Sequence, residues 1–197
     1  TSVLDSVTAS LPIIVGVSGQ SAQTIGNYAL MQRIFLLPIN VITNAVSKSY
    51  LAHSAEKLRE SSGSFFRYTL KVAIVLASVS LLAVALLSAI AGPLLSRLVA
   101  SEWNQAFVIF SVLAPSIVCK FVASSLSSSL LSANAKRLLV SWKLIAFVST
   151  YLSLSLAAHM DYSDFFRALM LNDTAIYLLL LTMIFYACRP RSFLLQS

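Results

Sequence analysis

The chain has 197 residues, of which 58% are hydrophobic and only 11% are charged, and its mean hydropathy is +0.84. A soluble domain carries about 25% charged residues, so this composition excludes a soluble globular domain and indicates a membrane protein. A net charge of +7 would suggest nucleic acid in a soluble chain, but here the basic residues flank apolar segments. There they contact lipid headgroups or fix orientation, so we expect membrane lipids and no nucleic acid as partners.

Most of the 14 Lys and Arg residues gather in three short regions, 48–71, 136–143 and 189–191. The gaps between them hold about 40 to 65 residues, roughly enough for two spans and a turn, so each cluster returns to one side of the membrane. The pattern predicts an all-α membrane protein with six spans and both chain ends in the cytoplasm. The spans are expected at about 1–18, 27–51, 66–91, 104–132, 138–158 and 165–187.

The first span, 1–18, starts at Thr1 without a signal peptide, so we expect the chain to be a piece of a longer polypeptide. A turn is expected at 19–26. The second span is the most polar of the six, and Pro38 in its middle should kink it. Residues 52–64 read as a hydrophilic cytoplasmic loop.

The third span, 66–91, is the purest apolar run, and Gly92 and Pro93 are expected to end it. A short outer turn with Arg97 and Glu102 leads to the serine-rich fourth span. An acidic outer turn that includes Asp161 separates the fifth span from the sixth. The outer loops therefore hold few basic residues, as the far side of a membrane requires.

Polar residues of the second span share one face of the predicted helix. At 3.6 residues per turn, four of them fall within roughly 60° of one another. They are Arg33, Asn40, Asn44 and Ser47, with Lys48 beside them. A helix with such a face should line a wet space.

The fourth span repeats this pattern with Ser116, Lys120, Ser124 and Ser127. A lone ammonium facing lipid would cost about 2.5 to 3.5 kcal/mol, so Lys120 should face the bundle interior or a water-filled cavity. The serines also fit a second reading, in which small residues let helices pack closely.

Two carboxylates, Asp5 and Asp173, lie inside predicted spans, where each needs a partner or water. One reading is a structural ion pair with Arg33 or Lys120. The other is coupling of transport to a proton or a cation. Cys119 and Cys188 are far apart in the sequence, and we interpret them as packing residues. The sequence contains no motif for catalysis or for a resident metal or cofactor, so we expect neither an enzyme nor a cofactor.

Residues 19–56 resemble the second span and following loop of the C-terminal half of bacterial polysaccharide exporters. The family pattern is approximately G-x-Y-x-x-x-x-R-x-x-x-x-P, and Gly26, Tyr28, Arg33 and Pro38 match it. A second stretch is similar to the family's outer turn and following span, through Glu102–Trp103, Ala114–Pro115 and the turn at 133–137. Members commonly have Phe-Gly-Pro before Glu-Trp, whereas this chain has Val-Ala-Ser.

This family is the oligosaccharide-lipid flippase group of the multidrug/oligosaccharidyl-lipid/polysaccharide exporter superfamily. The resemblance implies two six-helix lobes around a central cavity, with residues 1–197 forming the second lobe and the N-terminal lobe lying outside this chain. It also implies movement of an undecaprenyl-pyrophosphate-linked sugar repeat, for O-antigen or another exopolysaccharide, across the bacterial inner membrane. On that basis Arg33 and Lys120, with Lys48 as a further candidate, would attract the pyrophosphate, while Asn40, Asn44 and Ser124 could bind sugar hydroxyls.

Three alternatives stay open at this point. A multidrug exporter of the same superfamily would move cations, and Asp5 and Asp173 fit that activity. A membrane-embedded sugar-polymerising or acyl-transferring enzyme would need a large outer loop, which the sequence does not contain. A membrane scaffold without transport activity would use the polar faces only for helix packing.

Overall fold

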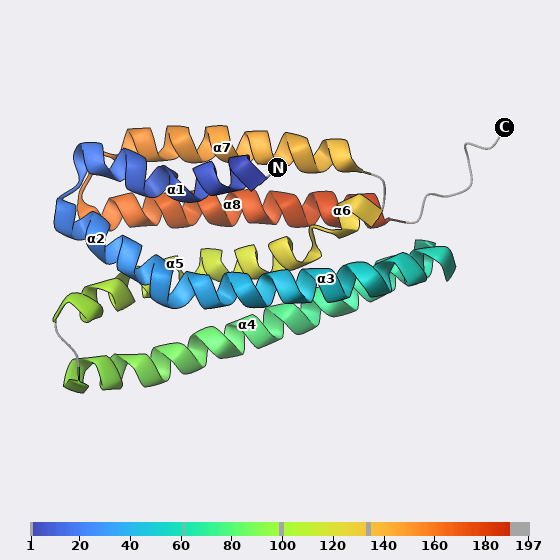
Figure 1. Cartoon of the computed structure of the whole chain (residues 1–197), viewed down its shortest axis with the longest axis horizontal. Coiled ribbons are helices and arrows are strands. Elements are labelled where there is room, and N and C mark those ends of the chain that lie inside the picture. The colour runs from blue at the N-terminus through green and yellow to red at the C-terminus, as the bar shows by residue number, and fades with distance from the viewer. Residues whose placement is uncertain (1, 61, 99–100, 133–134, 190–197) are drawn as a thin grey trace.

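The computed structural model describes residues 2–60, 62–98, 101–132 and 135–189, and every element within them is a helix (Figure 1). In chain order the elements are α1 (Ser2–Gly19), α2 (Ala22–Met31), the π-helix η1 (Gln32–Leu36), α3 (Leu37–Glu60), α4 (Ser62–Leu98), α5 (Ser101–Leu126), α6 (Ser129–Ser132), α7 (Lys136–Ala157) and α8 (Tyr162–Cys188). The predicted all-α class is therefore confirmed for the described residues.

Five helical segments of the described chain are long and apolar enough to cross a membrane. They are Ala22–Lys57, Gly63–Ile90, Gln105–Leu131, Lys136–Ala157 and Tyr162–Cys188, and the apolar helical stretch Ser6–Gly19 is shorter. These segments correspond in order to the six predicted spans. By length and composition, these helices are compatible with a multi-pass membrane protein.

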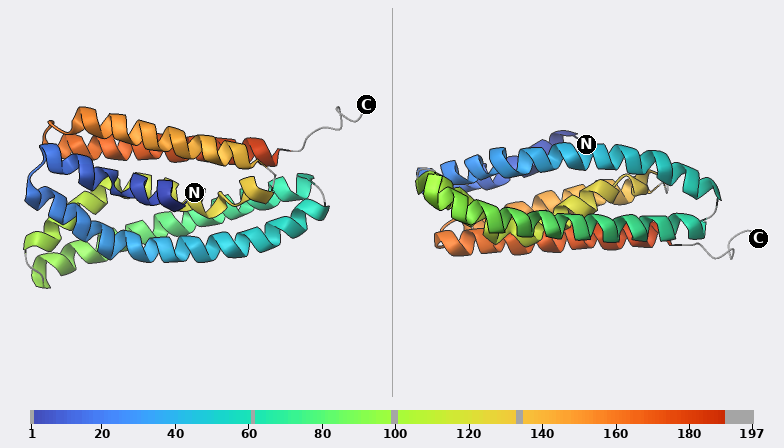
Figure 2. Two further views of the ribbon diagram at one scale, coloured as in Figure 1. Left: turned by 45° about the horizontal axis from the view of Figure 1, so that its top comes forward. Right: turned by 90° about the horizontal axis from the view of Figure 1, so that it is seen from below.

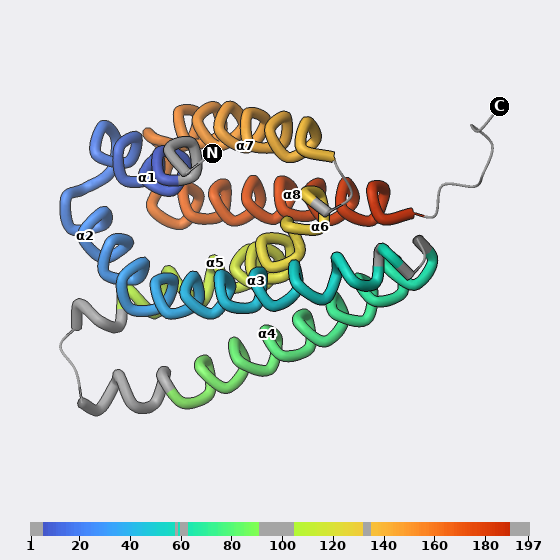
Figure 3. Tube along the Cα trace, turned by 45° about the vertical axis from the view of Figure 1, so that its right-hand side comes forward, coloured from blue at the N-terminus to red at the C-terminus, as the bar shows by residue number. Residues whose placement is uncertain are grey.

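The long helices run side by side in one elongated bundle (Figures 1 and 2). Helix α5 lies near its centre and packs against α2, α3, α4 and α8. Helix α7 packs against α1 and α8, so α1, α7 and α8 form one side of the bundle and α3 and α4 form the other (Figure 3). The centre of the bundle is therefore bordered by helices that are distant in sequence.

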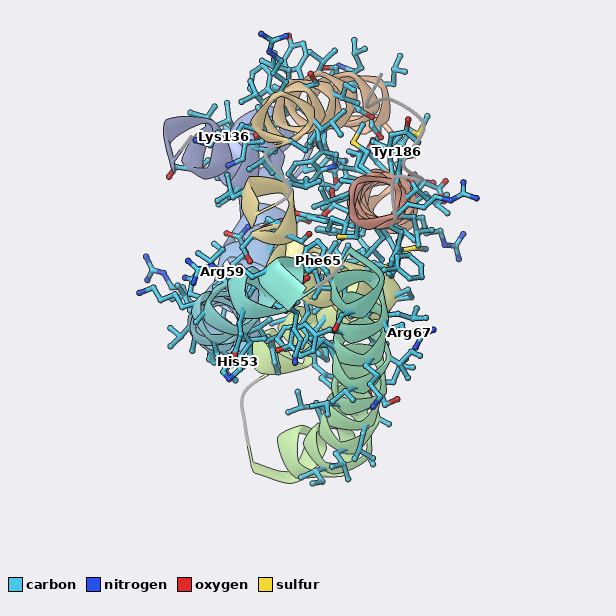
Figure 4. All side chains as sticks on the ribbon, turned by 90° about the vertical axis from the view of Figure 1, so that its right-hand side faces the viewer. His53, Arg59, Phe65, Arg67, Lys136 and Tyr186 are labelled. Atoms are coloured by element: carbon cyan, nitrogen blue, oxygen red, sulfur yellow. The ribbon has the colours of Figure 1, made fainter. Side chains whose placement is uncertain are left out.

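The described parts of the basic regions lie at one end of the bundle (Figure 1). The end of α3, the start of α4, the start of α7 and the end of α8 all lie there (Figure 1). In the view from that end, Arg59, Arg67 and Lys136 project from three different helices (Figure 4). Their common location is what the charge pattern predicted, and the other end carries the turns from α1 to α2 and from α7 to α8.

Two buried apolar clusters hold the helices together, one toward each end. The cluster at the end opposite the basic regions joins α1, α2, α5, α7 and α8 and includes Met31, Phe110, Leu154, Phe165 and Phe166. The cluster nearer the basic end joins α3 to α8 and includes Phe65, Leu126, Leu130, Leu180 and Ile184. Because lipid is itself apolar, these clusters stabilise the bundle by close packing more than by escape from water.

The outer surface is apolar, as expected for helices in lipid. On α4 the exposed side chains include Ile74, Val79, Leu82 and Ile90, each at least half exposed. A water-soluble protein does not present so many large apolar side chains along one helix. This exposed face of α4 is of the kind that a membrane helix presents to hydrocarbon.

The second span changes direction near the position where the sequence predicted a kink, since α2 runs obliquely to α3 (Figure 1). Pro38 is the second residue of α3, and the π-helix η1 directly precedes it. The Leu37 N–H donates to the Gln32 carbonyl, five residues back instead of four. Because proline has no N–H and its ring crowds the preceding turn, the wider π turn accommodates it. Arg33 lies within this π turn.

Three predicted boundaries were wrong. The turn expected at 19–26 is confined to Gln20 and Ser21, because the Ser21 hydroxyl caps α2 by accepting the Thr24 N–H at 3.2 Å. The loop expected at 52–64 is helical up to Glu60 and again from Ser62, because its Ala, Glu, Lys and Leu residues favour helix. Helix α4 also continues past Gly92 and Pro93 to Leu98.

Some predictions fall on residues outside the described part of the chain. The side chains of Arg97, Glu102 and Trp103, which carry the predicted outer turn and part of the family resemblance, are among them. The same holds for the side chain of Asp5.

The contact between α1 and α7 depends on Gly19. A Cβ added at this position would overlap the backbone carbonyl of Ala158, whereas one added at Gly26 meets nothing within 4 Å. The Gln20 side chain donates to the Ala158 carbonyl at 3.1 Å and to the Met160 carbonyl at 2.9 Å, so both residues fix the same junction.

We expect Gly19→Ala to lower the free energy of unfolding by about 2 kcal/mol, because backbone atoms cannot move aside as a flexible side chain can. Thermal unfolding in detergent measures this effect. Gly26→Ala, the control, should be neutral or slightly stabilising, since alanine favours helix over glycine. Equal unfolding temperatures for both variants would contradict the contact.

Candidate functional site

A partly open cavity of about 790 Å³, lined by both polar and apolar side chains, lies among the helices of the bundle. Its wall comes from α1, α2, η1, α3, α5, α7 and α8. All five residues predicted to bind substrate line it, together with Asp173: they are Arg33, Asn40, Asn44, Lys120 and Ser124. Two polar faces that are far apart in sequence thus border one space. That these five residues bind substrate stays a prediction.

The α3 wall is polar on the cavity side and apolar beside it. Asn40 and Asn44 are exposed and line the cavity, and so does Arg33 in the π turn. Val41, also on α3, is 69% exposed but does not line the cavity. The helical periodicity therefore predicted the orientation of this face correctly.

Lys120, on α5, is half-buried and also lines the cavity. Its Nζ lies 5.8 Å from the ring centroid of Tyr177 on α8. It also interacts electrostatically with Asp173 and with Tyr28. The ammonium is therefore bordered by side chains from two further helices, with the cavity beside it.

Asp173 interacts with Lys120 without a direct ion pair. An exposed ion pair at 3.5 Å joins Arg167 to Asp164, which precedes Asp173 on the same helix. Of the two partners predicted for Asp173, Lys120 is the one that acts on it electrostatically, although the two do not form the predicted ion pair. The two opposite charges share the cavity wall and partly compensate each other.

The sequence left two roles open for the serines of α5, lining a cavity or allowing close helix packing, and the structure shows serines of both kinds. Ser116 donates to the Leu113 carbonyl at 2.8 Å, and Ser127 donates to the Ser124 carbonyl at 2.8 Å, so both bond within their own segment. Ser124 is half-buried and lines the cavity without such a bond in the described chain. Ser127 and Ser128 also form the break between α5 and α6, and Ser128 contacts Ser47 of α3.

Several cavity residues were not predicted from the sequence. The most informative are Tyr28, Gln32, Trp142, Lys143 and Tyr177. Gln32 donates to the Tyr28 hydroxyl at 3.0 Å, which joins the π turn to α2. Tyr177 follows Asp173 by four residues on α8 and so shares its face, a spacing that could have indicated it.

Positive charge exceeds negative charge on the described cavity wall. Arg33, Lys120 and Lys143 contribute cations and Asp173 contributes an anion. In a space with low-dielectric walls this excess attracts anions far more strongly than it would in water. Among the described residues, no three His, Cys, Asp or Glu side chains gather in a way that could hold a metal ion. The charged and polar side chains of the cavity wall are of the kind that bind a polar, anionic molecule.

Comparison of the chain with protein-family models, with curated proteins and with solved structures finds no match.

Cysteine substitution tests whether the cavity holds water. With Cys119 and Cys188 replaced by alanine, we expect N40C and N44C to react about tenfold faster with a charged thiol reagent than V41C, because a thiolate forms only where water reaches. The reaction rate in membrane vesicles is the measurement. V41C is the matched control, since it lies on the same helix at high exposure but away from the cavity. Equal rates at all three positions would favour the scaffold reading.

Proposed function

We propose that this chain is one six-helix lobe of a transporter that moves an anionic, lipid-linked oligosaccharide across the bacterial inner membrane. The proposed substrate is an undecaprenyl-pyrophosphate-linked repeat unit for polysaccharide biosynthesis, such as O-antigen. The observation that carries the proposal is the cavity with excess positive charge inside an apolar bundle. The resemblance to polysaccharide exporters supports the same substrate class.

The division of polar groups over the cavity wall suits such a substrate. Lys120 and Arg33 offer charge-assisted hydrogen bonds to the phosphate oxygens. Asn40, Asn44 and Ser124 offer amide and hydroxyl groups of the kind that pair with sugar hydroxyls. The prenyl chain is apolar and remains in lipid. The cavity wall therefore binds the phosphate and sugar groups, while the bilayer solvates the prenyl chain.

Transport requires that the cavity open to each side in turn, and one lobe alone does not provide this. We propose that a second six-helix lobe, in the same polypeptide, completes a two-lobed twelve-helix transporter in which the lobes rock about the cavity. The basic end would face the cytoplasm, following the distribution of Lys and Arg. The apolar cluster with Phe110 and Phe166 would then lie on the periplasmic side of the cavity.

Flipping in reconstituted vesicles tests the proposal. The full polypeptide is reconstituted with a fluorescent prenyl-pyrophosphate oligosaccharide, and the fraction that reaches the opposite leaflet is followed by lectin binding. A prenyl oligosaccharide linked without phosphate is the control. We expect the first lipid to cross and the second to stay. Equal movement of the two lipids would exclude anion recognition by the cavity.

A multidrug or cation antiporter is the second candidate, and Asp173 on the cavity wall is the observation that favours it. Uptake of a fluorescent organic cation into the same vesicles distinguishes the two functions. Cation uptake that is lost in Asp173→Asn, with no lipid flipping, would support the antiporter.

A further inference from the structure

Two aromatic side chains of the cavity wall, Trp142 and Tyr177, lie near Lys120, and the proposed function assigns neither of them a role in substrate binding. Tyr177 on α8 has its ring centroid 5.8 Å from the Lys120 Nζ, and Trp142 on α7 has its ring centroid 5.6 Å from that of Tyr177. All three residues line the cavity. They connect α5, α8 and α7 at one level of the bundle.

Trp142 is fixed in place by its own hydrogen bond. Its indole Nε1 donates to the Ile176 carbonyl at 3.0 Å, and only 8% of the residue is exposed. An indole N–H within a membrane needs such an acceptor, because no water is present to replace it. Since Ile176 directly precedes Tyr177, this bond ties the indole to the backbone that carries the tyrosine.

Lys120 needs a positioning contact. Its side chain has four rotatable bonds and carries about 2 kcal/mol of rotamer entropy, so an ammonium without a fixed contact would sample many positions. Among the described residues no carboxylate lies within ion-pair distance of the ammonium, and Asp173 acts on it electrostatically at longer range. The Tyr177 side chain interacts with it through its ring and as a hydrogen-bond partner. A cation within about 6 Å of an aromatic centroid is attracted to the ring, more strongly where water is excluded.

We propose that Tyr177 is a positioning residue that holds the Lys120 ammonium toward the cavity, and that Trp142 holds Tyr177. Tyr177 itself need not touch the substrate. The inference rests on the proposed function for its ligand, the pyrophosphate group. It predicts that loss of the Tyr177 ring weakens anion binding even though the charge of Lys120 is unchanged.

Titration of the purified full polypeptide in lipid nanodiscs with inorganic pyrophosphate tests this inference. We expect Tyr177→Leu to weaken binding about tenfold, as measured by calorimetry, because the ammonium loses its attraction to the ring. Tyr177→Phe removes the hydroxyl, which hydrogen-bonds Lys120, and keeps the ring. If the ring is the main contact, this variant should bind within about threefold of the unsubstituted protein. Tyr186→Leu makes the same change on the same helix at a residue that is 75% exposed, and it should bind normally.

Fluorescence of Trp142 gives a second readout that a general loss of stability would not reproduce. The chain has two tryptophans, so Trp103→Phe leaves Trp142 as the reporter. We expect pyrophosphate to change its emission, with a midpoint about tenfold higher in Tyr177→Leu than in Tyr186→Leu. Unfolding temperatures are measured on the same samples.

The outcomes separate the inference from the proposed function. Pyrophosphate binding that Lys120→Met abolishes but Tyr177→Leu leaves intact would overturn the positioning role alone. Equal weakening in Tyr177→Phe and Tyr177→Leu would overturn the role of the ring. If pyrophosphate does not bind the unsubstituted protein at all, the anion cavity of the proposed function fails, and the inference fails with it.

Discussion

Replacing Lys120 by methionine is expected to reduce flipping of the pyrophosphate-linked lipid about 100-fold, a larger effect than any other single substitution in the cavity. Lys120 is half-buried in the wall, so its contact with an anion is made in a low-dielectric space. Methionine keeps most of the length of the side chain and removes only the charge. The initial rate of flipping in vesicles, at equal protein content, is the measurement.

Arg33→Met should lower the same rate about tenfold, because Arg33 is exposed and its interaction with the substrate is more strongly screened. Lys48→Met is the matched control. Lys48 lies on α3 beyond the polar face, is exposed, and does not line the cavity. The Lys48→Met variant should therefore transport the lipid at the normal rate. Full activity of both Lys120→Met and Arg33→Met would exclude the cationic cavity as the binding site.

Much of the fold could be predicted from the sequence, because hydropathy and charge act locally along a membrane protein. An apolar run of about 20 residues must be a helix in lipid, and basic residues mark one end of each pair of helices. The order of the spans followed directly. Helix ends did not, since a hydrophilic stretch such as 52–60 marks the exit from hydrocarbon while its helix-forming residues continue the helix.

The candidate site could be predicted only in part, for a geometric reason. Helical periodicity fixes which residues share a face, and so it grouped Arg33 with Asn40 and Asn44. It does not fix which helices are neighbours. For that reason the sequence could not choose between Arg33 and Lys120 as the partner of Asp173, a choice that depends on the packing of α5 against α8.

The aromatic residues were missed because aromatic side chains at helical spacing are usual in packed cores. Nothing in the sequence around Trp142 distinguishes it from a core residue, and its hydrogen bond to Ile176 depends on the packing of α7 against α8. Tyr28 belonged to the family pattern without a stated role, and it lies on the cavity wall beside Gln32 and Lys120.

A double-mutant cycle with Lys120→Met and Asp173→Asn is expected to show that the two charges also stabilise the fold. Each single variant should lower the free energy of unfolding by about 2 kcal/mol, because it leaves the other charge without compensation in a low-dielectric environment. The double variant should lose less than the sum of the two, with a coupling energy of about 1 kcal/mol. Unfolding in detergent measures all four proteins.

Arg167 and Asp164 provide the control pair, since they form an ion pair at 3.5 Å on the same helix as Asp173 with side chains 68% and 53% exposed. Their coupling should be near zero, because solvent screens exposed pairs. If the two single variants lower the free energy of unfolding additively, water in the cavity solvates each charge separately.

The flipping assay separates the two roles of Lys120. If Lys120 served only to balance Asp173, the double variant would regain transport. If Lys120 binds the pyrophosphate, the double variant stays as inactive as Lys120→Met.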